Sequence, residues 1–600
     1  MNILHLLSQF EVTGAETFAA TLANEQILHG HSVTIVSDTF HTPTTATIIS
    51  LPLGKRDFLQ RIANVRALSA IIAERKIDVV HAHSRAASWI GFYATRTGVV
   101  PLISTVHGRQ HVHFSSKLYS VYGEKIVAVC ESIREHLIDE LHINENKISI
   151  IRNGIDLQRW NAVQHTSGGR KIIAIVGRLS GPKGIVAQQI IQHVAPSLLK
   201  KFPELEVQIV GGEKGSELVL RAIQKVNAEI HSERIFYKGF VHTIEDVYSS
   251  STVVIGSGRV AMEAMVCGAS VIAIGESNYV GVVNEENLMS ALHTNFGDAG
   301  VHAEFNNEQC TRDIIQLIEQ GKQTEWGKNV IEKNFNIAQK VSEMYRVYAE
   351  ARSIKLGIKE IPILMYHRVT GGKPEGTKHG IYVTAKEFDR QLKVLLRKNF
   401  TTLTFFDIQK IIEGKLPLPR KPIMLTFDDG YEDNYEYAFP LFKKYNMFGV
   451  IFLLGDTTIT TNEWDIRKGE PAAKLLSDSH IAEMKEYGIE FGGHSMRHKK
   501  LSHIALDEAA QEIVECKKAI EQRIGSPIIS FAYPYGAVNE EVKSITQRAG
   551  FLFGIATDSG RKNFWSDLFE IRRVFIFPNT SRFAFWKKTS GWYHSYKKVH

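Results

Sequence analysis

Cysteine is scarce in this chain of 600 residues: there are four, far apart, and no two are spaced as a CxxC pair. This scarcity excludes a disulfide framework and a cysteine-rich zinc site, and it favours a reducing compartment. Apolar runs are short, and the run at 448–454 is far below the roughly 20 residues that cross a bilayer. The first residues lack the features of a secretion signal. We therefore expect a cytoplasmic protein without a membrane span.

The net charge of +7 is concentrated at one end of the chain. Residues 571–600 contain seven Lys and Arg, no Asp or Glu, and many interleaved aromatic residues. One interpretation is a final strand and helix that pack their aromatic side chains on the last domain. The other is peripheral contact with the inner face of the plasma membrane or with a polyanionic glycan. Nucleic acid is not expected as a partner, because the charge lies on no recognisable binding motif.

The first 350 residues alternate short β-branched runs with amphipathic segments, which is typical of parallel α/β sheets. A Ser/Gly-containing loop after residue 160 separates two such sets, and a polar connection near residue 355 precedes a third region. We predict an α/β protein with two Rossmann-like domains, at 1–165 and 166–355, and a third domain at 356–600. The predicted strands are 1–7, 32–37, 79–81, 102–105 and 125–129 in the first set, and 172–176, 206–210, 234–237, 252–255 and 270–273 in the second.

Three polar clusters mark the third region. TFDDG follows an apolar run and carries Asp428 and Asp429; at a strand end these point to opposite sides, so that one can bind a cation while the other faces water. HSMRH carries His494 and His498, which meet on one side if the segment is a helical turn. YPYG is a turn around Tyr535 that can direct a backbone N–H at an oxyanion. Each cluster alone is commonly a turn or a solvated face, but together they indicate metal-dependent hydrolysis.

In this order the clusters resemble the motifs of the polysaccharide deacetylase (NodB-homology) family, over residues 361–578. The resemblance implies a distorted, partly open (β/α) barrel that removes acetyl groups from N-acetylated sugars with a divalent metal, for which we expect zinc. It implies Asp428 as the general base, Asp429, His494 and His498 as metal ligands, and the backbone N–H of Tyr535 as the oxyanion donor.

Two positions depart from that family's pattern. Ala532 stands where an arginine often pairs with the base, which leaves Arg572 or Arg573 as the replacement. The late histidine that usually acts as general acid is also absent, whereas the early MYH segment resembles a variant that supplies it from another strand. Amide hydrolysis requires a proton for the departing amine, so we expect His367 to be the general acid. A purely structural histidine is the alternative.

Small-residue loops that precede helices recur in the first two regions. Gly14 opens a helix after a strand, so it lies at a natural anion-binding site. Arg178 and Lys183, in GRLSGPKG, place two cations at a strand end, which suits a nucleotide diphosphate. GSGR leads into a helix that contains Glu263. Solvated loops are one alternative, and a dinucleotide site with Asp38 as its acid is another.

Together with HAHS, STVHG and RNGID, these stretches resemble the GT-B glycosyltransferases of the large retaining family four. The resemblance implies that Arg178 and Lys183 hold the diphosphate of a nucleotide-sugar donor, that Glu263 contacts its ribose, and that His107 lines the sugar site. It implies no metal or further cofactor for the transfer. Ile255 departs from the pattern, because the family commonly has a glutamate there that contacts the transferred sugar.

We therefore predict a bifunctional enzyme. The transferase half adds a sugar, expected to be an N-acetylhexosamine from a UDP-linked donor, to a lipopolysaccharide or lipid-linked glycan, and the barrel removes an N-acetyl group. Two alternatives stay open. In the first, only the barrel is an active enzyme and the GT-B half is a glycan-binding module, which Ile255 allows. In the second, the whole chain is a membrane-tethered scaffold with inactive sites.

Overall fold

The computed structural model describes residues 1–8, 13–55, 57–110, 112, 120–161, 171–212, 217–241, 243–275, 278–300, 305–321, 324–378, 380–557, 563–590 and 593. The chain forms two compact units, Met1–Ala351 and Arg352–His600. None of the helices in the described ranges is long and apolar enough to cross a membrane. Residues 162–170, at the predicted boundary between the first two domains, lie outside these ranges.

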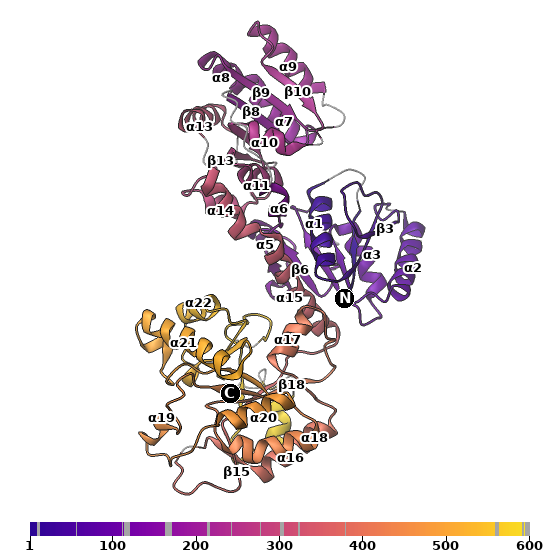
Figure 1. Ribbon diagram of the computed structural model, residues 1–600. Helices are drawn as coiled ribbons and strands as arrows, with labels where there is room; N and C mark the ends of the chain where they lie inside the picture. The colour runs from indigo at the N-terminus through magenta and orange to yellow at the C-terminus, as the bar shows by residue number, and fades with distance from the viewer. Residues whose placement is uncertain are drawn as a thin grey trace. The chain divides into compact units, whose positions relative to one another are not determined.

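A parallel sheet in the order β3-β2-β1-β4-β5-β6-β7 forms the first part of the N-terminal unit. Its inner strands are apolar because helices cover them, as Figure 1 shows for α1, α2 and α3. The strands are β1 Asn2–Leu6, β2 Ser32–Ser37, β3 Thr47–Ser50, β4 Val79–Ala82, β5 Leu102–Val106, β6 Lys125–Ala128 and β7 Ile148–Ile150, and the helices are α1 Gly14–Leu28, α2 Phe58–Glu74, α3 Arg85–Thr95, α5 Glu131–Asp139 and α6 Leu157–Asn161.

A second sheet, in the order β10-β9-β8-β11-β12-β13, follows in the same unit, and only its edge strand β13 is antiparallel. The predicted strands of both sheets are confirmed, whereas β3, β7 and β13 were not predicted. The strands are β8 Lys171–Val176, β9 Leu205–Val210, β10 Ile235–Gly239, β11 Val253–Gly256, β12 Ser270–Ile274 and β13 Tyr279–Val282, and the helices are α7 Gly181–Gln189, α8 Ala195–Lys201, α9 Glu217–Glu229, α10 Ile244–Ser250, α11 Arg259–Val266, α12 Leu288–His293, α13 Asn307–Gln320, α14 Thr324–Phe335 and α15 Ile337–Lys355.

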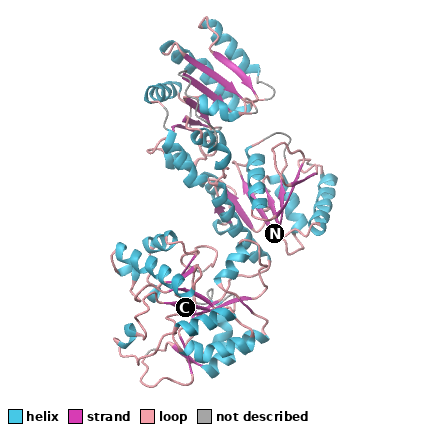
Figure 2. Ribbon diagram, viewed as in Figure 1, coloured by secondary structure: helices cyan, strands magenta, loops and turns pink. Residues whose placement is uncertain are grey.

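The C-terminal unit is built on parallel strands in the order β22-β21-β20-β19-β18-β14-β23, with β17 beside β18. This is the predicted distorted (β/α) barrel, and Figure 2 shows helices around its strands. Strands β22 and β23 form no ladder with each other in the described part, but Ile571, shortly before β23, makes an isolated parallel bridge with Ile555 of β22. The barrel strands are β14 Ile363–Tyr366, β17 Thr401–Thr402, β18 Pro422–Phe427, β19 Val450–Leu453, β20 Glu490–Gly493, β21 Ser530–Ala532, β22 Phe553–Ile555 and β23 Val574–Phe575.

A short parallel pair, β15 Arg368–Thr370 and β16 Tyr382–Thr384, lies outside that sheet. The helices of this unit are α16 Ala385–Arg397, α17 Phe405–Ile412, α18 Phe439–Tyr445, α19 Glu463–Ile466, α20 Asp478–Tyr487, α21 Leu506–Ile524, α22 Glu540–Arg548 and α23 Arg582–Thr589.

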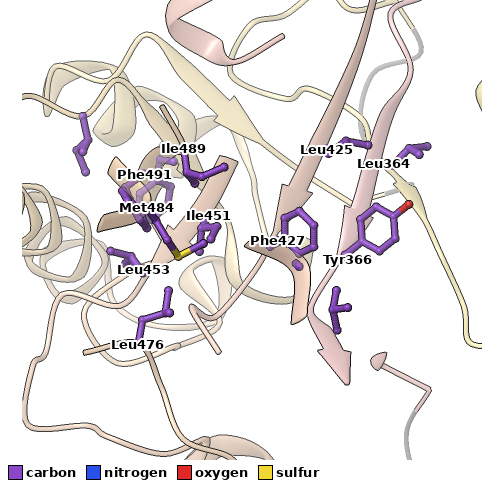
Figure 3. Close-up of a cluster of buried hydrophobic side chains, with 14 of the residues drawn as sticks. Leu364, Tyr366, Leu425, Phe427, Ile451, Leu453, Leu476, Met484, Ile489 and Phe491 are labelled. Carbon is purple, nitrogen blue, oxygen red and sulfur yellow. The ribbon is translucent and has the colours of Figure 1, made fainter. Parts of the chain in front are cut away.

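The barrel core lies directly behind the strand ends that carry the polar clusters. Tyr366 at the end of β14 and Phe427 at the end of β18 stack with ring centroids 5.1 Å apart (Figure 3). Leu453, next along the sheet, is buried in the same cluster. Burying such a side chain contributes roughly 1.5–3 kcal/mol, so the core holds these strand ends firmly in place.

Candidate functional site

Three candidate metal-ligand side chains converge at the carboxyl ends of β18 and β20. Asp429 Oδ1 lies 3.3 Å from His494 Nε2 and 3.1 Å from His498 Nε2. All three residues are buried. The ligand atoms of these three residues all lie within 4.8 Å of one another. Among the described residues, one other group of three potential metal-binding side chains meets the same limit. The structure thus brings together the ligands predicted from TFDDG and HSMRH.

Turn geometry, and not a helix, aligns the two histidines. The segment from His494 to His498 is a turn in which Ser495 has φ 64° and His498 has φ 58°, so the predicted helical turn is wrong. Asp429 at φ 73° and Tyr535 at φ 60° also adopt the left-handed region. Positive φ is rare outside glycine and persists only where the surrounding structure enforces it. Such residues concentrate at this site.

The donor set fits a divalent metal ion. His494 Nδ1 donates to the carbonyl oxygen of Ala532 at 2.7 Å, which leaves the lone pair on Nε2 for a metal. Asp429 Oδ1 is buried and has no hydrogen-bond partner within the described ranges. A buried carboxylate oxygen without a partner is costly unless a cation satisfies it. Two imidazole nitrogens and one carboxylate oxygen are ligands typical of catalytic zinc sites.

Asp428, the other carboxylate, faces an arginine from the far end of the domain. Arg573 Nη1 and Nη2 donate to Asp428 Oδ1 and Oδ2 at 2.5 and 2.7 Å. Arg573 is fully buried, and its Nε donates to the carbonyl oxygen of Ala556 at 2.9 Å. Burial opposes ionisation of Asp428, but the charges of Arg573 and His494 outweigh it and lower its pKa. Of the two arginines left open by the sequence, Arg573 makes the pair.

All six predicted deacetylase residues line one cavity of about 610 Å³. His367 lies there with a buried Nδ1 that no described residue hydrogen-bonds. The Tyr535 hydroxyl accepts a hydrogen bond from Lys468 Nζ at 3.1 Å. Trp464 stacks on His498 with centroids 4.6 Å apart. A cavity with aromatic walls and a few polar groups is typical of a site for a small organic group.

The C-terminal segment supplies part of this cavity wall. Phe575, Phe577, Lys588 and Tyr593 are lining residues, and Lys588 Nζ donates to the carbonyl oxygen of Phe575 at 2.7 Å. The described part of 571–600 therefore packs on the barrel, as one of the two interpretations predicted. Contact with a membrane stays a prediction. Residues 591, 592 and 594–600 of that segment lie outside the described ranges.

Arg178 and Lys183 come together beside the loop after β8, where both line a small cavity with Ser257. The acidic residue Asp298 also lies here. Nothing in the sequence pointed to it, because it is far from Lys183 in the chain and belongs to no recognisable motif. Lys183 Nζ pairs with Asp298 Oδ1 at 2.8 Å, and Ser257 Oγ donates to the same oxygen at 2.5 Å. A Cβ on Gly258 would lie 2.4 Å from Asp298 Oδ2, so this close approach requires glycine.

Glu263 is not among the described lining residues of that cavity. Its carboxylate pairs with Arg259 Nε at 2.6 Å and accepts from the Tyr248 hydroxyl at 3.3 Å. Burial raises the pKa of Glu263, and Arg259 opposes the shift. Ile255 is buried in the apolar core of this sheet. Glu263, the residue predicted to contact the ribose, is therefore already paired with Arg259. The side chain at position 255, where a glutamate was the family's usual residue, is apolar.

Gly14 and His107 lie at the carboxyl edge of the first sheet. Gly14 is the first residue of α1, and the Thr13 side chain caps that helix by accepting from the Glu16 N–H. His107 follows β5, and Phe18 of α1 contacts its ring at 5.5 Å between centroids. Ligands of parallel α/β sheets bind at this edge.

Family models match both units. The model described as Glycosyltransferase Family 4 matches residues 12–159, and Glycosyl transferases group 1 matches 158–333. The model described as Polysaccharide deacetylase matches 415–554. Glycosyltransferase models thus match the N-terminal unit, and a polysaccharide deacetylase model matches part of the C-terminal unit. The deacetylase match spans the candidate ligands Asp429, His494 and His498, whereas His367 and Arg573 fall outside it.

Similar proteins are found for each of the two units. The YxkH protein of Bacillus subtilis (strain 168), named as a polysaccharide deacetylase, is 28% identical over 226 residues, which are 38% of this chain and 75% of that protein. The poly-beta-1,6-N-acetyl-D-glucosamine N-deacetylase of Staphylococcus epidermidis is 24% identical over 246 residues, 38% of this chain and 82% of that protein. A glycosyltransferase structure from Rickettsia africae ESF-5 is 20% identical, covers 58% of this chain and 98% of that chain, and has a TM-score of 0.47.

Proposed function

We propose that the chain transfers an N-acetylhexosamine from a nucleotide sugar to a lipopolysaccharide or lipid-linked glycan, with retention, and then removes its acetyl group by metal-dependent hydrolysis. One observation carries the proposal: Asp429, His494 and His498 converge beneath a cavity, while Arg573 holds Asp428 beside them. This arrangement supports hydrolysis of an amide, because it supplies a cation site and a separate base.

Asp429, His494 and His498 would hold the metal, and zinc is our proposal for it. When bound, such an ion polarises the acetyl carbonyl and lowers the pKa of water to about 7. The coordination set leaves room for substrate, because only three protein ligands are provided. Trp464 and the His494 contact to Ala532 fix the orientations of the two imidazole rings.

The remaining site residues move protons and stabilise charge. Asp428 takes a proton from the attacking water, and Arg573 keeps that carboxylate ionised and oriented. The backbone N–H of Tyr535 donates to the oxyanion of the tetrahedral intermediate. His367 gives a proton to the departing amine, which leaves as a free amino group on the sugar.

The substrate class follows from the relatives and from the cavity. The Staphylococcus epidermidis relative is named for action on an N-acetyl-D-glucosamine polymer. Aromatic side chains of Trp464, Tyr535 and Phe577 line the cavity here, and flat apolar faces suit the faces of a sugar ring. We infer an N-acetylated amino sugar as the group that this cavity accepts.

The transferase half would bind a UDP-linked donor. Arg178 and Lys183, which line one cavity, would neutralise its diphosphate, Glu263 would accept from the ribose, and His107 would contact the sugar. Gly14 lies at the N-terminus of α1. No metal or other cofactor is assigned to this transfer. The product would carry the N-acetyl group that the deacetylase half removes.

The cellular location follows from the donor. Nucleotide sugars are cytosolic, so we place the enzyme in the cytoplasm, with the basic and aromatic segment 571–600 in peripheral contact with the inner face of the plasma membrane. Glycolipid acceptors would then lie within reach of both activities.

Incubation of the purified full chain with UDP-N-acetylglucosamine and a lipid-linked glycan tests the proposal by mass spectrometry. The acceptor is expected to gain one N-acetylhexosamine and then to lose one acetyl group, and Asp428→Asn is expected to stop at the first product. An acceptor that gains no sugar from any UDP-hexosamine would contradict the transferase part.

Ile255 favours a second function for the N-terminal unit. An apolar side chain occupies the position at which the family commonly has a sugar-contacting glutamate, and it is buried in the core of the sheet. In that case the unit binds glycan without transferring sugar, and the deacetylase acts alone. Acetyl release from a preformed glycan, with no donor turnover, would support this second function.

A further inference from the structure

The cavity at the candidate metal site is lined by more positive than negative charge. Its described lining contains four basic side chains and three carboxylates, which are Lys468, Arg572, Arg573 and Lys588 against Asp428, Asp429 and Asp465. A divalent ion held by Asp429, His494 and His498 would add two further positive charges. A cavity with such an excess of positive charge attracts anionic ligands in preference to neutral ones.

Each of the three lining carboxylates already has a partner. Asp428 accepts from both Nη atoms of Arg573, at 2.5 and 2.7 Å. Asp465 Oδ1 pairs with Lys468 Nζ at 3.2 Å. Asp429 contacts the two candidate ligand histidines. Among the described lining residues, no carboxylate is left over to neutralise a further cation.

Arg572 is such a further cation. It is the chain neighbour of Arg573 and lines the same cavity, but its surroundings are different. Its Nε is buried, and its side chain has no hydrogen bond and no ion pair within the described ranges. Its Nη atoms are not enclosed in this way, and the residue as a whole is half-buried. The guanidinium has therefore lost part of its hydration without gaining an anion, which is costly.

The backbone on both sides of Arg572 is held in place. The Ile571 N–H donates to the carbonyl oxygen of Gly554 at 2.9 Å, and the Arg573 N–H donates to that of Thr557 at 3.2 Å. Strand β23 begins directly afterwards, with Val574. The position of the cation is thus set by the barrel before any ligand arrives, and a preorganised group loses less free energy when it binds.

Deacetylation itself gives this cation no role. Arg573 already orients Asp428, and the acetyl amide and the sugar hydroxyls are neutral groups. A guanidinium presents five N–H donors in a planar fork that matches the two oxygens of a carboxylate or a phosphate. The chemistry of Arg572 is therefore that of an oxyanion site beside the amide.

We propose that Arg572 is a specificity-determining residue of the deacetylase cavity, and that the N-acetylated sugar accepted there carries an adjacent oxyanion, a phosphate or a carboxylate, which Arg572 binds. This inference rests on the proposed deacetylase function and narrows its substrate class to anionic amino-sugar derivatives. Phosphate and carboxylate share the chemistry that the guanidinium recognises, and the substrates below distinguish them.

Acetate release by the zinc-loaded full chain from two matched pairs of substrates tests the proposal. One pair is N-acetylglucosamine 1-phosphate and methyl N-acetylglucosaminide. The other is a disaccharide of glucuronic acid and N-acetylglucosamine and the same disaccharide with glucose in place of glucuronic acid. In at least one pair we expect kcat/KM of the anionic member to be higher by roughly 10–100-fold, as for one charge-assisted hydrogen bond. Equal values within both pairs would overturn the proposal.

Arg572→Met removes the charge and keeps a side chain of similar length. We expect the preference for the anionic substrate to be lost mainly through a higher KM, because the anion is held in the ground state as well as in the transition state. Arg572→Lys is expected to keep part of the preference, since it keeps the charge without the fork. Arg397→Met is the matched control, because Arg397 is exposed and does not line the cavity. A preference that persists in folded Arg572→Met would overturn the assignment.

Acetate, the product of the reaction, is another anion that a guanidinium in this cavity can bind. Weaker inhibition by acetate in Arg572→Met, together with equal losses of kcat/KM on the anionic and neutral substrates, would assign Arg572 to the product. That result would also overturn the proposal.

Binding is measured separately from turnover with the deacetylated forms of the same four compounds, which cannot react. In calorimetric titration of the full chain, we expect an anionic form to bind Arg572→Met roughly 10–100-fold more weakly than wild type, and its neutral partner to change less. Phosphate bound by Arg178 and Lys183 contributes equally to both proteins. If wild type releases no acetate from any substrate but shows this difference, the deacetylase function fails while the anion site stands. No difference for either anionic form would remove the anion site.

Discussion

Arg573 and Asp428 form a buried, bidentate ion pair, in which the two guanidinium Nη atoms donate to the two carboxylate oxygens at 2.5 and 2.7 Å. The pair exists because β23, the strand that begins after Arg573, lies parallel to β14, which in turn pairs with β18 before Asp428. Arg573 Nη1 also donates to Thr426 Oγ1 at 3.2 Å. The base of the proposed hydrolysis is therefore oriented by the last strand of the domain.

Replacing Arg573 is expected to destabilise the C-terminal unit. In Arg573→Met, Asp428 stays buried without its partner, which costs about 3–5 kcal/mol. The double variant Asp428→Asn, Arg573→Met is expected to recover part of this loss, because no unpaired charge remains. The stability losses of the single and double variants are measured by denaturing the full chain and monitoring hydrogen exchange of β18. Strictly additive losses would show that the two residues are not coupled.

Asp429→Asn is expected to weaken metal binding by more than about 100-fold, because it removes a charged ligand. Loss of a residue that only hydrogen-bonds to a ligand typically costs roughly 10–100-fold. Metal content after dialysis against zinc, measured by inductively coupled plasma mass spectrometry, checks this. His503→Gln is the matched control, because His503 is exposed and does not line the cavity. Equal zinc content in both variants would remove the metal site from Asp429.

His367→Gln is expected to lower kcat for an N-acetylated sugar by about 100-fold or more, the usual contribution of a general acid. An aryl acetate has a leaving group that needs no proton, so its hydrolysis is expected to change little. The ratio of the two rates is the measurement. A parallel loss on both substrates would assign His367 a structural role instead.

Stability of the barrel is expected to fall between pH 5 and pH 8 because of Glu490. Burial raises the pKa of Glu490 to about 7, above its ordinary value of 4.5. The folded state therefore binds the proton more tightly than the unfolded chain. The stabilisation is complete below pH 4.5 and is lost as the pH rises through 7, amounting to about 3 kcal/mol.

Glu490→Gln is expected to remove this pH dependence. The glutamine oxygen can still accept from the Phe406 N–H, which lies 2.9 Å from Glu490 Oε2. Hydrogen exchange of β20 peptides in the full chain at pH 5 and pH 8 provides the comparison. A pH dependence that persists unchanged in the variant would place its origin in another group.

Lys183→Met is expected to weaken UDP binding by roughly 10–100-fold, the loss of one charge-assisted hydrogen bond. Asp298→Asn is expected to act in the opposite direction or not at all, because it frees Lys183 from the ion pair at 2.8 Å. Calorimetric titration with UDP measures both. Lys201→Met serves as control, since Lys201 pairs with Glu319 on the surface. Equal affinity in Lys183→Met and Lys201→Met would exclude Lys183 from the nucleotide site.

Local patterns in the sequence were sufficient for the sheets and for the ligand types. β-branched runs such as 32–37 became strands at the predicted residues because strand propensity and alternation act over a few neighbours. Asp429, His494 and His498 were recognised from motifs, and the structure places their ligand atoms together. The edge strands β3, β7 and β13 were missed, because their short runs carry a weak apolar signal.

The amino-acid sequence by itself determined the α/β architecture, the order of the regions that resemble glycosyltransferases and deacetylases, and the residue types of the candidate metal site, since these depend on short segments. The tertiary structure alone decided that Arg573 rather than Arg572 meets Asp428 and that Asp298 faces Lys183. The physical reason is the same in each case. These contacts join residues far apart in the chain, and only strand pairing and burial bring them within hydrogen-bonding distance.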